Sequence, residues 1–272
     1  MGVLAVNEII TVRENKSNGI RCNRNNKIPQ CKSRICRYQS GRSGFWVFLC
    51  EENPGDHHGA INANADHFPL EFFGNASHAV RQQNGTDANM TAIKAYNAIE
   101  FMVAKEVEPH DVVVFNAGEI KGGTANNIIS DYCVMNCTLR TWNDKTEQKL
   151  LDGIKNITEL TAKMSGATAK YTQLNRYPAL YNDDIIVERV KNAAAKVIGT
   201  DNVLPQDERS LGAEDFAYFA NEKPSALFWL GVANNEREFS GTHTSGFDID
   251  ENALDVGVKI FKQFVFDNMD NT

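Results

Sequence analysis

The stretch Asp131-Tyr132-Cys133-Val134-Met135-Asn136-Cys137-Thr138-Leu139-Arg140-Thr141-Trp142 predicts a β-strand in the middle of the chain. Cys133 and Cys137 are four residues apart, so at the two-residue period of a strand they share a face. The simplest interpretation is two reduced, half-buried thiols. This strand decides the fold, because predicted helices and strands flank it in a regular order.

The flanking sequence predicts a strand at 65–73, a helix at 90–105 behind the capping residues Asp87-Ala88-Asn89, and a strand at 112–120. On the other side, Asp144 is expected to N-cap a helix over 145–164 that ends at Gly166, and a further strand covers 169–174. The compact arrangement for this order is a ferredoxin-like β-α-β-β-α-β domain, with two helices on one face of a four-stranded antiparallel sheet.

The remaining sequence divides into two parts of different character. Residues 176–272 predict the last part of an α/β layer, through helices at 184–198, 212–221 and 251–266 and a buried strand at 226–231. Residues 1–49 are crowded with Arg, Lys, Asn, Ser and Cys and show no periodicity, apart from a strand at 44–49. The fold class is therefore α/β plus α+β, in three segments: 1–59, 60–175 and 176–272.

Charge and composition limit the partners that we expect. The formal charge is −7, but residues 1–43 hold nine Lys and Arg and two Asp and Glu, so the remainder carries −14. A remainder of this charge repels phosphates, so we expect no nucleic acid as main partner, although the basic arm leaves that alternative open. The chain has neither an apolar run long enough to span a membrane nor a signal peptide, which favours the cytoplasm.

Several loops hold residue types that could take part in catalysis or substrate binding. His78 follows a strand end among small residues, where an imidazole can donate to a developing oxyanion; the alternative is a surface histidine. The Gly122–Asp131 loop holds two glycines, which allow close backbone approach or positive φ, and the amides of Asn126 and Asn127; the alternative is an ordinary hairpin loop.

Charged and imidazole groups recur in three other places. His243 lies in a polar loop and suits a metal ligand, but a metal site requires three or more ligands. Glu214 and Asp215 stand at a predicted helix start, where the helix dipole favours carboxylates in any case. The cluster Cys50–His58 holds Glu, Asp and His together, which could bind a divalent metal or act as acid and base; the alternative is a solvated Pro-Gly turn.

Five motifs follow one another along the chain: Asn75-Ala76-Ser77-His78-Ala79, Gly122-Gly123-Thr124-Ala125-Asn126-Asn127-Ile128-Ile129, Leu139-Arg140-Thr141, Gly212-Ala213-Glu214-Asp215-Phe216, and His243 with Phe247-Asp248-Ile249-Asp250-Glu251. In this order they resemble the motifs of the co-catalytic di-metal peptidase and amidohydrolase family, which includes aminoacylase, hippurate hydrolase and the auxin-conjugate amidohydrolases. The resemblance runs from about Gly59 to Phe266.

The resemblance implies a metal-dependent amidohydrolase, using zinc or manganese, that cleaves the amide bond of N-acyl or conjugated amino acids or short peptides. Residues 60–175 would be its lid and dimerisation domain, and His78 would reach the partner subunit's site to stabilise the oxyanion. Asn127 and Arg140 would hold substrate, beside the substrate-facing pair Glu214 and Asp215. His243 would be a metal ligand.

The chain also departs from the family pattern. Family members carry a longer segment ahead of the lid, with a Cys or His metal motif, a Glu-Glu pair and another histidine ligand, whereas 59 residues precede residue 60 here. We therefore expect a truncated or frame-disturbed chain that is weakly active or inactive alone. The alternative is a non-catalytic homodimerisation module derived from that family.

Overall fold

The computed structural model describes residues 3–6, 47–49, 60–205, 209–232 and 243–269. The chain forms two compact units. Unit 1 comprises residues 1–53, 182–208 and 223–272, and unit 2 comprises residues 54–181 and 209–222.

Unit 2 is built on an antiparallel sheet in the order β10-β4-β8-β6. Strand β9 pairs with the end of β4 at Leu70–Phe73, and β10 pairs with its start at residues 65–67, so both lie along one edge of β4. The β-α-β-β-α-β order predicted from the sequence is present. The bounds are β4 (Ala65–Phe73), β6 (Val113–Gly122), β8 (Tyr132–Thr141), β9 (Thr168–Tyr171) and β10 (Asn175–Tyr177).

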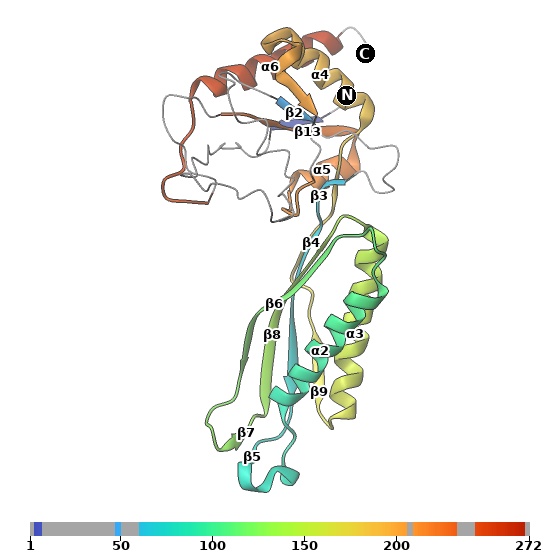
Figure 1. Ribbon diagram of the computed structural model, residues 1–272, viewed down its shortest axis with the longest axis vertical. Helices are drawn as coiled ribbons and strands as arrows, with labels where there is room; N and C mark the ends of the chain where they lie inside the picture. Colours follow the sequence, from blue (N-terminus) through green and yellow to red (C-terminus); the bar gives the residue numbers. More distant parts are fainter. Residues whose placement is uncertain (1–2, 7–46, 50–59, 206–208, 233–242, 270–272) are drawn as a thin grey trace, which may run out of the picture. The chain divides into compact units, whose positions relative to one another are not determined.

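Helices α2 (Ala88–Glu106) and α3 (Asp144–Met164) lie side by side on one face of this sheet (Figure 1). Asp87 caps α2 as predicted, since its side chain accepts a hydrogen bond from the Met90 amide at 3.1 Å. The predicted cap of α3 is wrong by one residue. Asn143, not Asp144, accepts from the Lys145 and Thr146 amides at 3.0 and 3.4 Å, which places the Asp144 carboxylate in the first helical turn, where the dipole favours it.

The core of unit 2 lies between the helices and the sheet. Alternate residues of β4 (Phe68, Leu70 and Phe72) are buried there, as the two-residue period requires. Cys133 and Cys137 are free thiols on the same face, as predicted, but they are 1% and 5% exposed and so fully buried rather than half-buried.

Shorter elements surround the ends of this sheet. Strand β3 (Ala60–Asn62) pairs with β11 (Leu180–Tyr181), and β5 (Ser77–His78) pairs with β7 (Ile128–Ile129). Helix η1 (Ala79–Asn84) follows β5. Helix α5 (Phe216–Glu222) begins four residues later than predicted, because the backbone before it is bonded to residue 63 rather than into a helix.

Unit 1 contains a sheet in the order β1-β13-β2-β12, with bounds β1 (Val3–Val6), β2 (Val47–Leu49), β12 (Val203–Pro205) and β13 (Ser225–Leu230). Helices α4 (Asp184–Ile198) and α6 (Asn252–Asn268) pack on it, and Val190, Phe228 and Ile260 share their core; the short helix η2 (Thr200–Asn202) follows α4.

The prediction that residues 1–49 hold no element before 44–49 is wrong at residues 3–6, because β1 pairs in parallel with β13. The rest of the arm, including Cys22, Cys31 and Cys36, lies outside the described residues. Within the described ranges, no helix is both long and apolar enough to cross a membrane.

Candidate functional site

His78 is the last residue of β5, and its exposed imidazole has a defined orientation. The Val80 amide donates to its Nδ1 at 3.2 Å. A neutral imidazole carries one proton, so with Nδ1 acting as acceptor the proton resides on Nε2. The ring therefore presents an N–H donor on the side away from its own backbone.

The loop that carries His78 is closed at its base by residues 74–75 and 86. Asn75 and Thr86 exchange two backbone hydrogen bonds, at 3.0 and 2.9 Å. Gly74 lies so close to this pairing that a Cβ there would stand 2.0 Å from the Thr86 carbonyl oxygen. The loop thus requires glycine at position 74, because any side chain would force the backbone apart.

Asn127 lies next to His78. The Ala79 amide donates to the Asn127 carbonyl at 2.9 Å, and His78 pairs with Ile128 across β5 and β7. Both glycines of the loop act as the sequence predicts. A Cβ on Gly122 would stand 2.0 Å from the Asn89 side-chain oxygen, and Gly123 has a φ of +83°.

Arg140 lies at the opposite end of β8 from these two residues. It lies eight positions along the extended strand from Tyr132, which corresponds to roughly 26 Å. Its Nη1 donates to the Leu211 carbonyl at 2.7 Å. His78, Asn127 and Arg140 thus do not form one cluster within a single chain.

Glu214 and Asp215 lie in the same unit as Arg140 and immediately precede α5. The Phe216 amide donates to Glu214 Oε1 at 3.3 Å, and the Ala217 and Tyr218 amides donate to the carbonyls of Glu214 and Asp215 at 3.2 and 3.1 Å. Asp215 is exposed and Glu214 is half-buried. Glu214 and Asp215 thus follow three and four residues after Leu211, whose carbonyl accepts the hydrogen bond from Arg140.

His243 belongs to unit 1, where it is exposed and adopts a left-handed φ of 62°. The cluster Cys50–His58 lies outside the described residues. Among the residues that the structure does describe, no group of three His, Cys, Asp or Glu side chains could hold a metal ion. That part of the chain does not by itself form a metal site.

A buried ionic cluster in unit 2 was missed by the sequence reasoning. Arg176 donates to both carboxylate oxygens of Glu147, at 3.0 and 2.8 Å, and Gln173 donates to Asp66 at 2.8 Å. Asp66 and Glu147 have fully buried side chains. Burial, followed by the neighbouring Glu147 carboxyl, raises the pKa of Asp66 to about 7.

The signal for this cluster is present in the sequence. Asp66 is separated by two, four and six residues from Phe68, Leu70 and Phe72, so its side chain lies on the same face of β4 and must point into the core. Glu147 likewise precedes Leu150 and Ile154 at helical spacing, on the buried face of α3.

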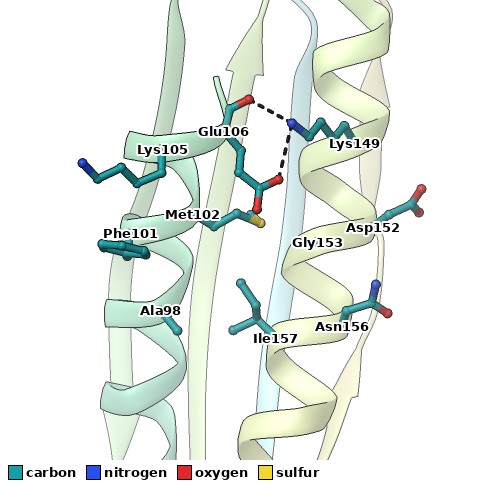
Figure 2. Close-up of a pocket in the computed structure, with 10 residues that line it drawn as sticks. All are labelled: Ala98, Phe101, Met102, Lys105, Glu106, Lys149, Asp152, Gly153, Asn156 and Ile157. Carbon is teal, nitrogen blue, oxygen red and sulfur yellow. Dashed lines mark hydrogen bonds and ion pairs between the residues drawn. The ribbon is translucent and has the colours of Figure 1, made fainter. Parts of the chain in front are cut away.

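A groove of about 560 Å³ lies between α2 and α3 (Figure 2). Its polar groups are partly engaged, because Lys149 donates to the Glu106 carbonyl at 2.9 Å and pairs with the Glu106 carboxylate at 3.4 Å. Gly153, one of the lining residues, lets the two helices approach closely, since a Cβ there would stand 2.3 Å from Met102 Sδ. None of the candidate site residues lines this groove.

The model of the family described as Peptidase family M20/M25/M40 matches residues 41–267. The match begins at residue 41, earlier than the motifs alone indicated. An uncharacterised hydrolase, y4tI, from Sinorhizobium fredii is 30% identical over 213 residues, covering 78% of this chain and 52% of that protein.

Two further proteins are similar to this chain. N-acetylcysteine deacetylase from Bacillus subtilis is 26% identical over 75% of this chain and 52% of its own length. The crystal structure of the Bacillus subtilis YXEP protein, described as a dinuclear metal binding peptidase from the M20 family, matches with a TM-score of 0.57 and 24% identity, over 77% of this chain and 51% of that one. The chain spans about half the length of the curated relatives it matches.

Proposed function

The chain belongs to peptidase family M20/M25/M40, and on this premise we propose that its reaction is the metal-dependent hydrolysis of the amide bond in N-acyl or conjugated amino acids, or in short peptides. The deacetylase among its relatives supports this substrate class. So does the presence in unit 2 of an oriented imidazole donor and of a guanidinium suited to a carboxylate.

In this proposal residues 60–175 act as a lid and dimerisation domain, and residues 176–272 form the C-terminal part of the catalytic domain. The exposed edge strand β6 is the feature that supports the proposal of a dimer. Among the described residues β6 ends the sheet order, and Val114 and Ile120 on it are 37% and 49% exposed. An edge with open backbone groups and apolar side chains can pair with a second copy of itself.

His78 is the proposed oxyanion donor, acting in the site of the partner subunit. The observation that carries this role is the hydrogen bond from the Val80 amide to its Nδ1 at 3.2 Å, which fixes the ring and leaves Nε2 as the donor of the neutral imidazole. A preorganised donor of this kind stabilises the tetrahedral oxyanion, and loss of one such donor raises the barrier by about 3 kcal/mol. Action in the partner's site accounts for its separation from Arg140 along β8.

The other candidates have binding roles in this proposal. Arg140, Asn127, Glu214 and Asp215 contact the substrate, with the planar guanidinium of Arg140 suited to its carboxylate. His243 is one ligand of a divalent zinc or manganese ion.

Mixing two inactive variants tests this proposal directly. One chain carries His78→Ala and the other Arg140→Ala; they are refolded together and assayed on N-acetyl amino acids with added zinc or manganese. If each site uses His78 of one chain and Arg140 of the other, random pairing restores about one quarter of the wild-type activity.

Three outcomes would contradict parts of the proposal. No recovery on mixing contradicts action in the partner's site, and a monomer in light scattering contradicts the dimer. A stable dimer whose wild-type chain hydrolyses nothing would favour the second candidate, a non-catalytic dimerisation module, which the exposed edge of β6 also supports.

A further inference from the structure

The backbone of residues 210–212 is held by donors from the end of the unit 2 sheet. The Ser210 carbonyl accepts from the Ala63 amide at 3.0 Å and from Trp142 Nε1 at 2.8 Å. The next carbonyl, of Leu211, accepts from Arg140 at 2.7 Å. The third, of Gly212, shares the Ala63 amide at 3.1 Å. Three consecutive peptide groups are therefore fixed to one place.

Trp142 is the side chain at the centre of this arrangement. Its half-buried indole donates to Ser210, and the guanidinium carbon of Arg209 stands 5.6 Å from the centre of its ring. The Tyr181 hydroxyl donates to the Trp142 carbonyl at 3.2 Å. The indole thus contacts residues 209 and 210, while its own backbone is held from β11.

The segment 213–215 is fixed on its other side by α5. The Tyr218 hydroxyl donates to the Arg176 carbonyl in β10, and the Tyr218 ring lies 6.2 Å from that of Tyr177. Glu214 and Asp215 lie between the two attachments: Glu214 is two residues from Gly212, and Asp215 is three residues from both Gly212 and Tyr218.

We propose that Trp142 is a positioning residue, whose indole N–H holds the 210–212 backbone and thereby sets where the Glu214 and Asp215 carboxylates stand. The catalytic relevance of those carboxylates rests on the proposed function, whereas the attachment itself does not. Arg140 contributes to the same attachment through one of its five N–H donors, which leaves its planar fork able to face a carboxylate as well.

Trp142→Phe is the appropriate variant, because phenylalanine keeps an aromatic ring beside Arg209 and removes the N–H. Tyr181→Phe is the matched control, since it removes a hydrogen bond from the same tryptophan without touching residues 210–212. Arg140→Lys, which weakens the hold on Leu211, is a second variant on the same segment should Trp142→Phe fail to fold.

Amide hydrogen exchange provides the first measurement. In Trp142→Phe we expect peptides covering residues 209–218 to exchange about fivefold faster, which corresponds to about 1 kcal/mol, with α2, α3 and β8 unchanged. Tyr181→Phe should leave residues 209–218 at the wild-type rate. Unchanged exchange in both Trp142→Phe and Arg140→Lys, or acceleration spread equally over the whole unit, would overturn the inference.

Kinetics on N-acetyl amino acids separate positioning from general support of the fold. Trp142→Phe should raise KM by about fivefold at unchanged kcat, because it displaces substrate-facing groups and not the reacting atoms, while Tyr181→Phe leaves both constants unchanged. Equal changes in the two variants would count against the inference. Localised exchange in a wild-type protein without hydrolysis would uphold the attachment and reject the proposed function alone.

Discussion

Arg176 grips Glu147 with two parallel hydrogen bonds, from Nε to Oε1 at 3.0 Å and from Nη2 to Oε2 at 2.8 Å. The carboxylate is fully buried, whereas the arginine side chain is about half exposed. Arg176 belongs to β10 and Glu147 to the first turns of α3, so this pair joins the strand that leaves the sheet to the helix that covers it.

Removal of the arginine should therefore destabilise the protein strongly. We expect Arg176→Gln to lower the free energy of unfolding by about 3 kcal/mol, because it leaves a buried carboxylate without its counter-ion. Urea denaturation measures this value. Lys170→Gln is the control, since that exposed ammonium lies 3.7 Å from Glu71 and should contribute less than about 1 kcal/mol. Similar losses in the two variants would show that the Arg176–Glu147 pair has no special weight.

The buried carboxyl pair should also make stability depend on pH. Asp66 titrates near 7 in the folded protein and near 4 when unfolded, so the folded state binds more protons between these values. The free energy of unfolding should accordingly fall as pH rises from about 4 to about 7, by up to roughly 1.4 kcal/mol per pH unit. Its stabilising contribution is complete below pH 4 and lost above pH 7.

Asp66→Asn tests this dependence, because an amide has nearly the same shape and does not ionise. The charged groups that act on Asp66 are Glu147 of α3 and Arg176 of β10, and the Tyr171 hydroxyl of β9 lies close enough for its pKa to be raised by Asp66. The difference in unfolding free energy between variant and wild type should grow with pH across this window. A constant difference from pH 4.5 to 7.5 would refute the assignment.

Gly74 and Gly153 provide a matched pair of glycine substitutions. A Cβ at Gly74 meets the Thr86 backbone oxygen at 2.0 Å, whereas one at Gly153 meets a flexible methionine side chain. Gly74→Ala should therefore lower the free energy of unfolding by about 1–3 kcal/mol and increase amide exchange in the loop that carries His78. Gly153→Ala should be closer to neutral, since alanine gains about 1 kcal/mol of helix propensity against the displacement of Met102. The reverse order would contradict this account.

Cys137 should be nearly unreactive in the folded protein. Burial raises the pKa of its thiol to about 12, so its thiolate fraction at pH 8 is about three orders of magnitude below that of an ordinary cysteine. Iodoacetamide labelling at pH 8, read residue by residue with mass spectrometry, should show Cys137 modified only after urea is added. Rapid labelling in native buffer would mean that this core opens readily.

Much of unit 2 could be predicted because its elements are long and regular. The ten-residue strand β8 and the helices α2 and α3 carry their own periodicity, and their predicted bounds are correct within a few residues. The three- and four-residue strands β1, β2 and β12 are stabilised by partners distant in sequence, so only the one that adjoins a longer apolar run was found.

The candidate site shows the same limit. Gly122, Gly123 and the cap Asp87 act locally, and a local pattern predicted them. The attachment of residues 210–212 to Ala63, Trp142 and Arg140 joins parts of the chain separated by about seventy residues or more, and no local pattern encodes it. The separation of His78 from Arg140 likewise depends on the length of β8, which the sequence predicts. That His78 lies at the opposite end of β8 from Arg140 follows only from the pairing of β5 with β7, and no local pattern predicts that pairing.

Strands β4 and β8 extend from the end of the sheet where Ala63 and Trp142 bond residues 210–212 to the end that adjoins the loop bearing His78, and they thus form a lever arm. With an arm of roughly 26 Å, a rotation of only about 10° at the attached end would displace the far end by about 4–5 Å. That displacement is comparable to the difference between hydrogen-bond contact and its complete loss. The hydrogen bonds of Arg176 to Glu147 and of Trp142 to Ser210 stiffen this end of the sheet. They therefore limit how far the His78 imidazole at the opposite end can be displaced.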